Sequence, residues 1–243
     1  MSSWLERYRS GDLVQVWTEI VAVGPDLWLD ARTLKDAGAV AQETMRRARA
    51  NVERLVELLP SVGYVFAQYD EQPVFEAPDA GIVGQLDVLE GRIGALPLAL
   101  RAWYEEVGRV NLVGSHPEWE YAYDDALVVD APIDYVSSEY ELWEADRGTE
   151  RERSRFVIDL APDYLHKANV SGGVPYGVEV PSRSGDCLLI GEHHQTTFVN
   201  YLRIAFRWGG FPGWDRGAVD GWARPATSPP VVLRELADAM QPL

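Results

Sequence analysis

The sequence predicts an α+β fold in which N-terminal helices precede a twisted antiparallel or mixed sheet of about five or six strands packed by helices. Three observations support this class. Apolar residues recur at three- and four-residue spacing in the first half, short runs rich in Val, Ile, Leu and aromatic residues follow, and another helical pattern comes near the end. We expect the strands to pair as hairpins or a meander, because no helical pattern of useful length separates them.

Helices account for most of the first half of the chain. Residues 11–23 and 36–59 each place their apolar side chains on one helical stripe. Residues 64–81 contain Pro and Gly and are expected to form a connector with short extended pieces. Two further helices are expected over 82–93 and 97–107, and the second has a buried stripe and is followed by the capping residue Gly108.

The second half contains the expected strands. Each run is short, apolar and bounded by Gly, Pro, Asp or Ser, and the runs are residues 110–114, 126–129, 156–160, 176–180 and 187–190. A helix is expected over 196–208 and a short terminal one over 231–240. Together these patterns predict a helical extension and connector over residues 1–80 and an α+β domain over residues 81–243.

Composition excludes several classes of protein. The chain has 243 residues, 38 acidic and 22 basic side chains, and a net charge of −16. A nucleic-acid binder that neutralises phosphates is therefore not expected. The most hydrophobic stretch, residues 13–29, is interrupted by polar residues, so no membrane anchor is expected either. The first residues lack a signal-peptide pattern and Cys187 is the single cysteine, so we expect a cytoplasmic protein.

The negative charge is concentrated in the middle of the chain. Residues 61–145 carry 17 acidic and 3 basic side chains, and no Lys or Arg lies between Arg109 and Arg147. Solvated surface is one interpretation and a recognition face for a cationic protein is the other. Aromatic residues interleave with the carboxylates, which favours the interpretation as a recognition face. The predicted partner-binding residues are Glu118, Glu120, Tyr123, Asp124, Asp125, Asp130, Asp134, Tyr140, Glu141, Trp143 and Glu144.

Enzymatic and metal-binding patterns are weak. A metal site built from His166, Glu192 and His193 is conceivable, but the adjacent His193 and His194 do not match the i, i+4 pair of a metal-binding helix. We expect those two histidines to be a surface or capping pair before the 196–208 helix. Phosphate-loop, nucleophile-elbow and EF-hand patterns are also missing. The sequence therefore predicts no catalytic residue, no cofactor and no metal ligand.

One passage resembles a known family. The run ALPLALRAWYEEVGRVNLVGSHPEW, residues 95–119, is similar to the hallmark of the SUKH superfamily: Leu-Pro opens a helix that ends in an aromatic residue and Gly, and a strand, a Gly and a Trp follow. The passages PDYLHKANVSGGVPYGVEVP (162–181) and FVNYLRIAFRWGGFPGW (198–214) are similar to segments of bacterial members of this group. Residues 1–80 lie outside the resemblance.

The resemblance implies an α+β fold and a non-enzymatic role. The superfamily includes bacterial immunity proteins that neutralise toxins and fungal regulators of cell-wall assembly. It implies an antitoxin whose acidic face binds a basic toxin such as a nuclease; a regulatory or scaffolding module for an endogenous cytoplasmic protein is the alternative. The motif residues are interpreted as determinants of the fold, and they are Leu96, Pro97, Trp103, Tyr104, Gly108, Gly114 and Trp119.

Overall fold

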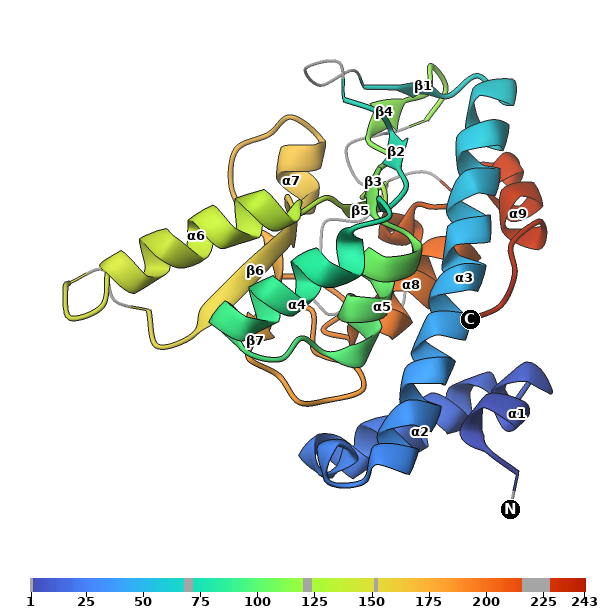
Figure 1. Cartoon of the computed structure of the whole chain (residues 1–243). Helices are drawn as coiled ribbons and strands as arrows, with labels where there is room; N and C mark the ends of the chain where they lie inside the picture. Colours follow the sequence, from blue (N-terminus) through green and yellow to red (C-terminus); the bar gives the residue numbers. More distant parts are fainter. Residues whose placement is uncertain (1, 68–71, 120–123, 151–152, 216–227) are drawn as a thin grey trace.

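The protein folds into helices and short antiparallel strands, which confirms the α+β class (Figure 1). The computed structural model describes residues 2–67, 72–119, 124–150, 153–215 and 228–243. The helices are α1 (Trp4–Arg9), α2 (Leu13–Val23), α3 (Ala31–Ser61), α4 (Ile82–Ile93), α5 (Leu98–Glu106), α6 (Ile133–Ala145), α7 (Tyr164–Lys167), α8 (Phe198–Arg207) and α9 (Val231–Asp238), with short 3-10 helices η1 (Gly24–Leu29) and η3 (Pro212–Trp214).

The strands are short and form three ladders. They are β1 (Val65–Phe66), β2 (Phe75–Glu76), β3 (Arg109–Asn111), β4 (Gly114–Ser115), β5 (Val128–Val129), β6 (Phe156–Ala161) and β7 (Tyr176–Val180). β1 pairs with β4, β3 lies between β2 and β5, and β6 pairs with β7, all antiparallel. A backbone hydrogen bond from Asp130 N to Leu160 O (2.8 Å) joins the β5 and β6 segments. This bond connects two of the three ladders.

Two expectations about the strands are wrong. Residues 187–190 form only isolated bridges, Gly177 with Ile190 and Leu188 with Thr197. A helix of useful length also separates two strands that were expected to follow one another directly, because α6 lies between β5 and β6, whereas β6 and β7 pair antiparallel as expected. The helix α6 begins after Pro132, whose fixed φ suits the start of a helix.

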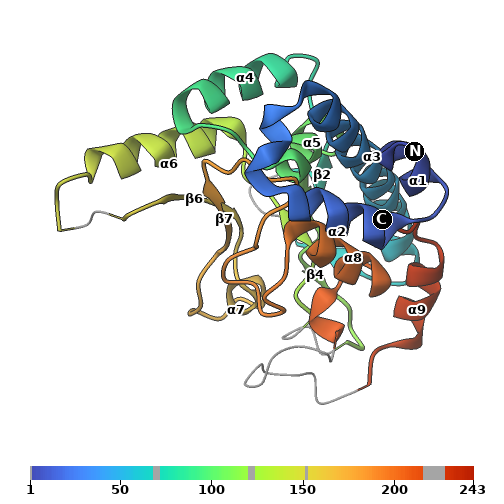
Figure 2. The same cartoon turned by 90° about the horizontal axis from the view of Figure 1, so that it is seen from below.

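The long helix α3 runs along one side of the molecule and brings the first part of the chain into the core (Figures 1 and 2). Its start is capped by the Asp30 carboxylate, which accepts a hydrogen bond from Thr33 N (2.9 Å). Its buried stripe, which includes Val40, Met45 and Leu55, belongs to one hydrophobic cluster that extends from Tyr8 to Leu243. No helix in the described residues combines the length and hydropathy that crossing a membrane requires.

The large apolar residues of the motif lie in this core, as their structural interpretation predicts, and they are Leu96, Trp103, Tyr104 and Trp119. Trp103 of α5 is fully buried, and its indole N–H donates to Gly108 O (2.8 Å). The hydroxyl of Tyr104, also on α5, donates to Ala131 O (2.9 Å), which fixes the chain just before α6. Gly108 has φ +90°, and a Cβ there would lie 2.3 Å from Glu76 O. This passage therefore positions β2, β3 and the start of α6.

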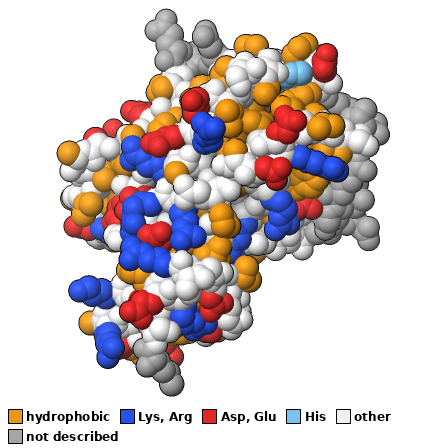
Figure 3. Space-filling model, turned by 90° about the vertical axis from the view of Figure 1, so that its right-hand side faces the viewer, with side chains coloured by type: hydrophobic (Ala, Val, Ile, Leu, Met, Phe, Trp, Pro, Cys, Tyr) orange, Lys and Arg blue, Asp and Glu red, His pale blue; other side chains and the backbone are white. Residues whose placement is uncertain are grey.

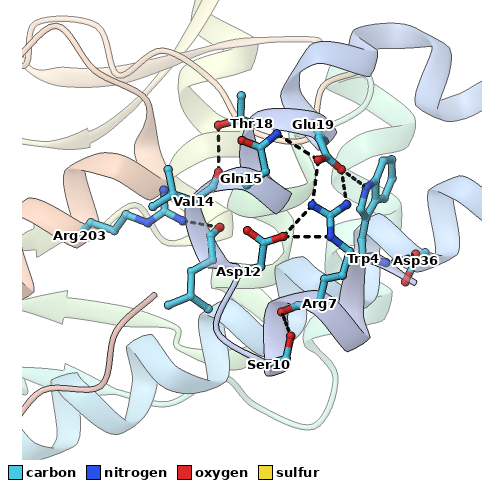
Figure 4. A network of polar contacts seen from close by, with 11 residues as sticks. Trp4, Arg7, Ser10, Asp12, Val14, Gln15, Thr18, Glu19, Asp36 and Arg203 are labelled. Carbon is cyan, nitrogen blue, oxygen red and sulfur yellow. Dashed lines mark hydrogen bonds and ion pairs between the residues drawn. The ribbon is translucent and has the colours of Figure 1, made fainter. Parts of the chain in front are cut away.

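A polar network fixes the N-terminal helices (Figure 4). The Arg7 guanidinium pairs with Asp12 (2.7 Å) and with Glu19 (2.6 Å). Glu19 also accepts the Trp4 indole N–H (3.0 Å). From α8, Arg203 donates to Leu13 O (3.1 Å), so the network connects α1 and α2 to the C-terminal half of the chain.

Candidate functional site

The predicted acidic segment contains a helix that projects from the body of the molecule. In Figures 1 and 2, α6 extends to the left with α4 beside it, on the side opposite α3 and α9. Aromatic residues attach α6 to the strand β6. The Tyr140 and Trp143 rings lie 5.1 Å and 5.9 Å from the Phe156 ring, and the Trp143 indole N–H donates to Arg153 O (3.0 Å). These two aromatic residues are half-buried anchors of the helix, so the expectation that they face a partner is not met.

The other side of α6 is open to solvent. Its exposed residues follow helical spacing, and we call them the acidic face: Asp134, Tyr135, Ser138, Glu141, Leu142, Glu144 and Ala145. Leu142 is 61% exposed and Tyr135 is 43% exposed, so the face offers apolar surface beside its carboxylates. Glu141 pairs with Arg92 (2.9 Å). No described Lys or Arg nitrogen lies within 4.0 Å of the carboxylates of Asp134 or Glu144.

The helix α3 gives a contrast, because its surface charges are compensated. Glu43 pairs with Arg9, Arg46 and Arg47, and Arg49 and Arg54 pair with acidic residues on the same helix. Figure 3 faces the side of the molecule that carries α3 and shows acidic and basic side chains interspersed. The unbalanced negative charge of α6 is therefore a local feature and not a property of every helix.

The structure distributes the other predicted contact residues over different environments. Glu118 is exposed, and Asp130 pairs with Arg109 (2.6 Å). Glu120 and Tyr123 lie outside the described residues. Asp124 and Asp125 are buried, with exposed fractions of 6% and 1%, so the expectation that they belong to an accessible face is wrong. They lie directly before the buried strand β5, where the chain enters the core.

Asp124 and Asp125 belong instead to a group of buried polar side chains. Asp125 has φ +48°, an uncommon backbone conformation that aspartate tolerates better than most residues. Its partners come from α7, β7, α8 and the turn after Ile190. We call the group the buried polar cluster, and its members are Asp124, Asp125, Lys167, Tyr176, Glu192, His193, His194 and Tyr201.

An ion pair and several close contacts connect the cluster. Lys167 Nζ lies 2.7 Å from Asp125 Oδ1, and both side chains are at least 97% buried. The Tyr176 hydroxyl donates to Asp125 Oδ2 (3.1 Å), and His193 Nδ1 lies 3.8 Å from the same oxygen. Glu192 Oε1 lies 3.3 Å from His193 Nδ1 and 2.5 Å from His194 Nδ1. Asp125 thus lies between Lys167 and the turn that carries His193 and His194.

Burial dominates the electrostatics of the cluster. It raises the pKa of Asp125 to about 6, although Lys167 acts to lower it. Burial, followed by the Asp125 charge, raises the pKa of Asp124 well above its ordinary value. Burial, with smaller effects of His194 and Lys167, lowers the pKa of His193 to about 2, so this imidazole is neutral at physiological pH. The cluster therefore presents the neutral imidazole of His193 beside carboxylate oxygens.

Sequence reasoning did not find this cluster, because its members are distant in the chain. Asp125 and Lys167 are 42 residues apart, and no local pattern pairs them. His193 and His194 were expected to be a surface or capping pair, and the surface alternative is wrong, since their side chains are 5% and 6% exposed. His166 is half exposed and bonds the Asp163 carboxylate outside the cluster. The available signal was the consecutive Glu-His-His in a turn, together with the scarcity of lysine.

Comparison with protein-family models, with curated proteins and with solved structures finds no match for this chain. The resemblance to the SUKH superfamily therefore stays a prediction.

Proposed function

We propose that this chain is a non-enzymatic protein-binding module that binds a cationic protein through the acidic face of α6. The observation that carries the proposal is the composition of this exposed surface: it combines the carboxylates of Asp134, Glu141 and Glu144 with the exposed side chains of Tyr135 and Leu142. The half-buried anchors on the other side of α6 hold the helix in place, so its exposed side is free to make contacts.

The physical properties of such a surface suit a basic partner. A field of one sign steers an oppositely charged protein during diffusion and raises its association rate. Exposed apolar side chains beside the carboxylates then supply contact area, and tyrosine is frequent among the residues that dominate binding energy. The acidic face has both elements. We therefore expect the association rate to fall as salt is added, because the Debye length is about 10 Å at 0.1 M.

The resemblance suggests the class of partner. It implies a basic toxin such as a nuclease, which would make this chain a cytoplasmic immunity protein or antitoxin. A regulatory or scaffolding module that binds an endogenous protein is the second candidate. The helices α1 to α3 favour this alternative, because they lie outside the resemblance and yet share the core with the rest of the chain.

A differential capture experiment tests the proposal. The bait is the full chain, compared with the variant Glu141→Lys/Glu144→Lys. Both new lysines lie in the last turns of α6, where a positive charge suits the helix dipole, so the fold is expected to persist. The matched control is Glu235→Lys/Asp238→Lys, which makes the same charge change on the exposed side of α9.

We expect a basic protein to be retained from a native lysate by the unmodified chain and by the α9 control, and to be released by moderate salt. The α6 variant should lose it, with an affinity at least about tenfold weaker, or about 1.4 kcal/mol. Equal retention by both variants would contradict the assignment of the acidic face. A basic nuclease as the retained protein supports immunity, and an endogenous regulatory partner supports the second candidate.

A further inference from the structure

We infer that Glu192, His193 and His194 form a binding site for one divalent transition-metal ion of the Zn²⁺ class. The site is separate from the acidic face and does not depend on the function proposed for it. It lies in the turn between Ile190, which bridges to β7, and the helix α8.

The geometry of the three side chains fits a single small ion. One ligand atom from each residue can be chosen so that all three lie within 4.8 Å of one another. Glu192 Oε1 is 3.3 Å from His193 Nδ1, and the centroids of the two imidazole rings are 3.8 Å apart. Ligands bound to Zn²⁺ at 2.0–2.1 Å in a tetrahedral arrangement are separated by about 3.4 Å. His194 Nδ1 bonds Glu192 Oε1 (2.5 Å), so His194 offers its Nε2 to the ion, and the side chains rotate to bring the three donors around it.

Burial gives an independent indication. The side chains of Glu192, His193 and His194 are 0%, 5% and 6% exposed. His194 Nε2 is buried and has no hydrogen-bond partner among the described residues. A buried polar atom without a partner costs about 1–3 kcal/mol, whereas an imidazole nitrogen that binds a metal has no such cost. The local structure thus leaves a donor atom available in a dry site.

The charge around the turn also favours a cation. Asp124, Asp125 and Glu192 supply three buried carboxyl groups, while Lys167 is the one buried ammonium group of the cluster. Asp125 directs Oδ1 to Lys167 and Oδ2 toward His193 (3.8 Å). A divalent ion beside His193 would balance the excess negative charge, which is costly in a buried environment.

The donor set selects the kind of metal. Two imidazoles and one carboxylate suit Zn²⁺ and other first-row divalent ions, whereas Ca²⁺ and Mg²⁺ prefer oxygen ligands alone. The carboxylate of Asp125, with Oδ2 at 3.8 Å from His193 Nδ1, adds negative charge beside the ion. The ion would hold the turn at residues 191–194 against Asp125 and Lys167, which lie before β5 and at the end of α7.

Metal titration of the full, untagged chain tests the site. After treatment with a chelator and dialysis, we expect the protein to bind one Zn²⁺ per chain in calorimetry, and Co²⁺ to produce visible absorption bands. Glu192→Gln and His194→Ala should each weaken Zn²⁺ binding at least about 100-fold. The matched control His166→Ala, which removes a half-exposed histidine outside the turn, should bind as the unmodified chain does.

Absence of saturable Zn²⁺ binding by the unmodified chain would overturn the inference, and so would binding that Glu192→Gln and His194→Ala leave unchanged. X-ray absorption of the Zn²⁺-loaded unmodified chain decides the matter even when a variant fails to fold. Two imidazoles and oxygen around the ion are the expected result, and a shell of sulfur or of oxygen alone would refute the site.

Discussion

The buried ion pair between Lys167 and Asp125 shows how strongly a single side chain depends on its partner. Lys167→Met leaves the Asp125 carboxyl buried without its cation, so we expect the free energy of unfolding to fall by about 3–5 kcal/mol at pH 7. The double variant Lys167→Met/Asp125→Asn removes both charges and should recover much of this loss. Asparagine also tolerates the positive φ of residue 125. Urea denaturation in the presence of chelator measures both, and equal losses would contradict the pairing.

The backbone at Gly108 leaves no room for a side chain. A Cβ at this position would lie 2.3 Å from Glu76 O and would also require a left-handed backbone with φ +90°. We expect Gly108→Ala to destabilise the protein by more than about 2 kcal/mol, because the backbone of the β2 segment must move. The control is Gly91→Ala in α4, where a Cβ meets nothing within 4 Å. That change should stabilise the protein by about 0.5–1 kcal/mol, and equal thermal shifts would refute the argument.

At the scale of elements, the sequence predicted helices well where an apolar stripe ends at Gly or Pro. The helix α4 has the predicted bounds, and α5 and α8 differ from prediction by one or two residues. The helix α6 was not predicted, although Ile133, Val136, Tyr140 and Trp143 recur at helical spacing. The short strands were harder, since a two-residue ladder depends on distant partners and not on a local pattern.

The network around Arg7 predicts a pH dependence for the N-terminal helices. Hydrogen bonds from Arg7, Gln15 and Trp4 lower the pKa of Glu19 from 4.5 to about 2. Because the folded-state pKa lies below that of the unfolded chain, ionised Glu19 favours folding. This contribution is complete above pH 4.5 and disappears as pH falls toward 2. The difference in Tm between the unmodified chain and Glu19→Gln should therefore shrink over this range.

The control for that measurement is Glu57→Gln, which alters an ion pair whose glutamate is 68% exposed and should change Tm little at any pH. A difference between the unmodified chain and Glu19→Gln that stays constant from pH 5 to pH 2 would contradict the role given to the Arg7 network in Figure 4.

On the scale of the whole molecule, residues 1–80 and 81–243 contribute to one hydrophobic cluster. We therefore expect a single cooperative unfolding transition, observed alike by circular dichroism and by tryptophan fluorescence. Leu55→Ala in the α3 stripe should lower the stability of the entire chain by about 2–5 kcal/mol. Two separate transitions, with only the first one shifted by Leu55→Ala, would show that the N-terminal helices fold independently.

The central claim is that the acidic face binds a cationic protein, and site-specific photocrosslinking tests it most directly. A photoreactive residue replaces Leu142 on α6 in one sample and Val231 on α9, which is 75% exposed, in the other. In native lysate we predict an adduct with a basic protein from position 142, absent from position 231 and reduced by added salt. No adduct at position 142, or the same adducts from both positions, would contradict the account.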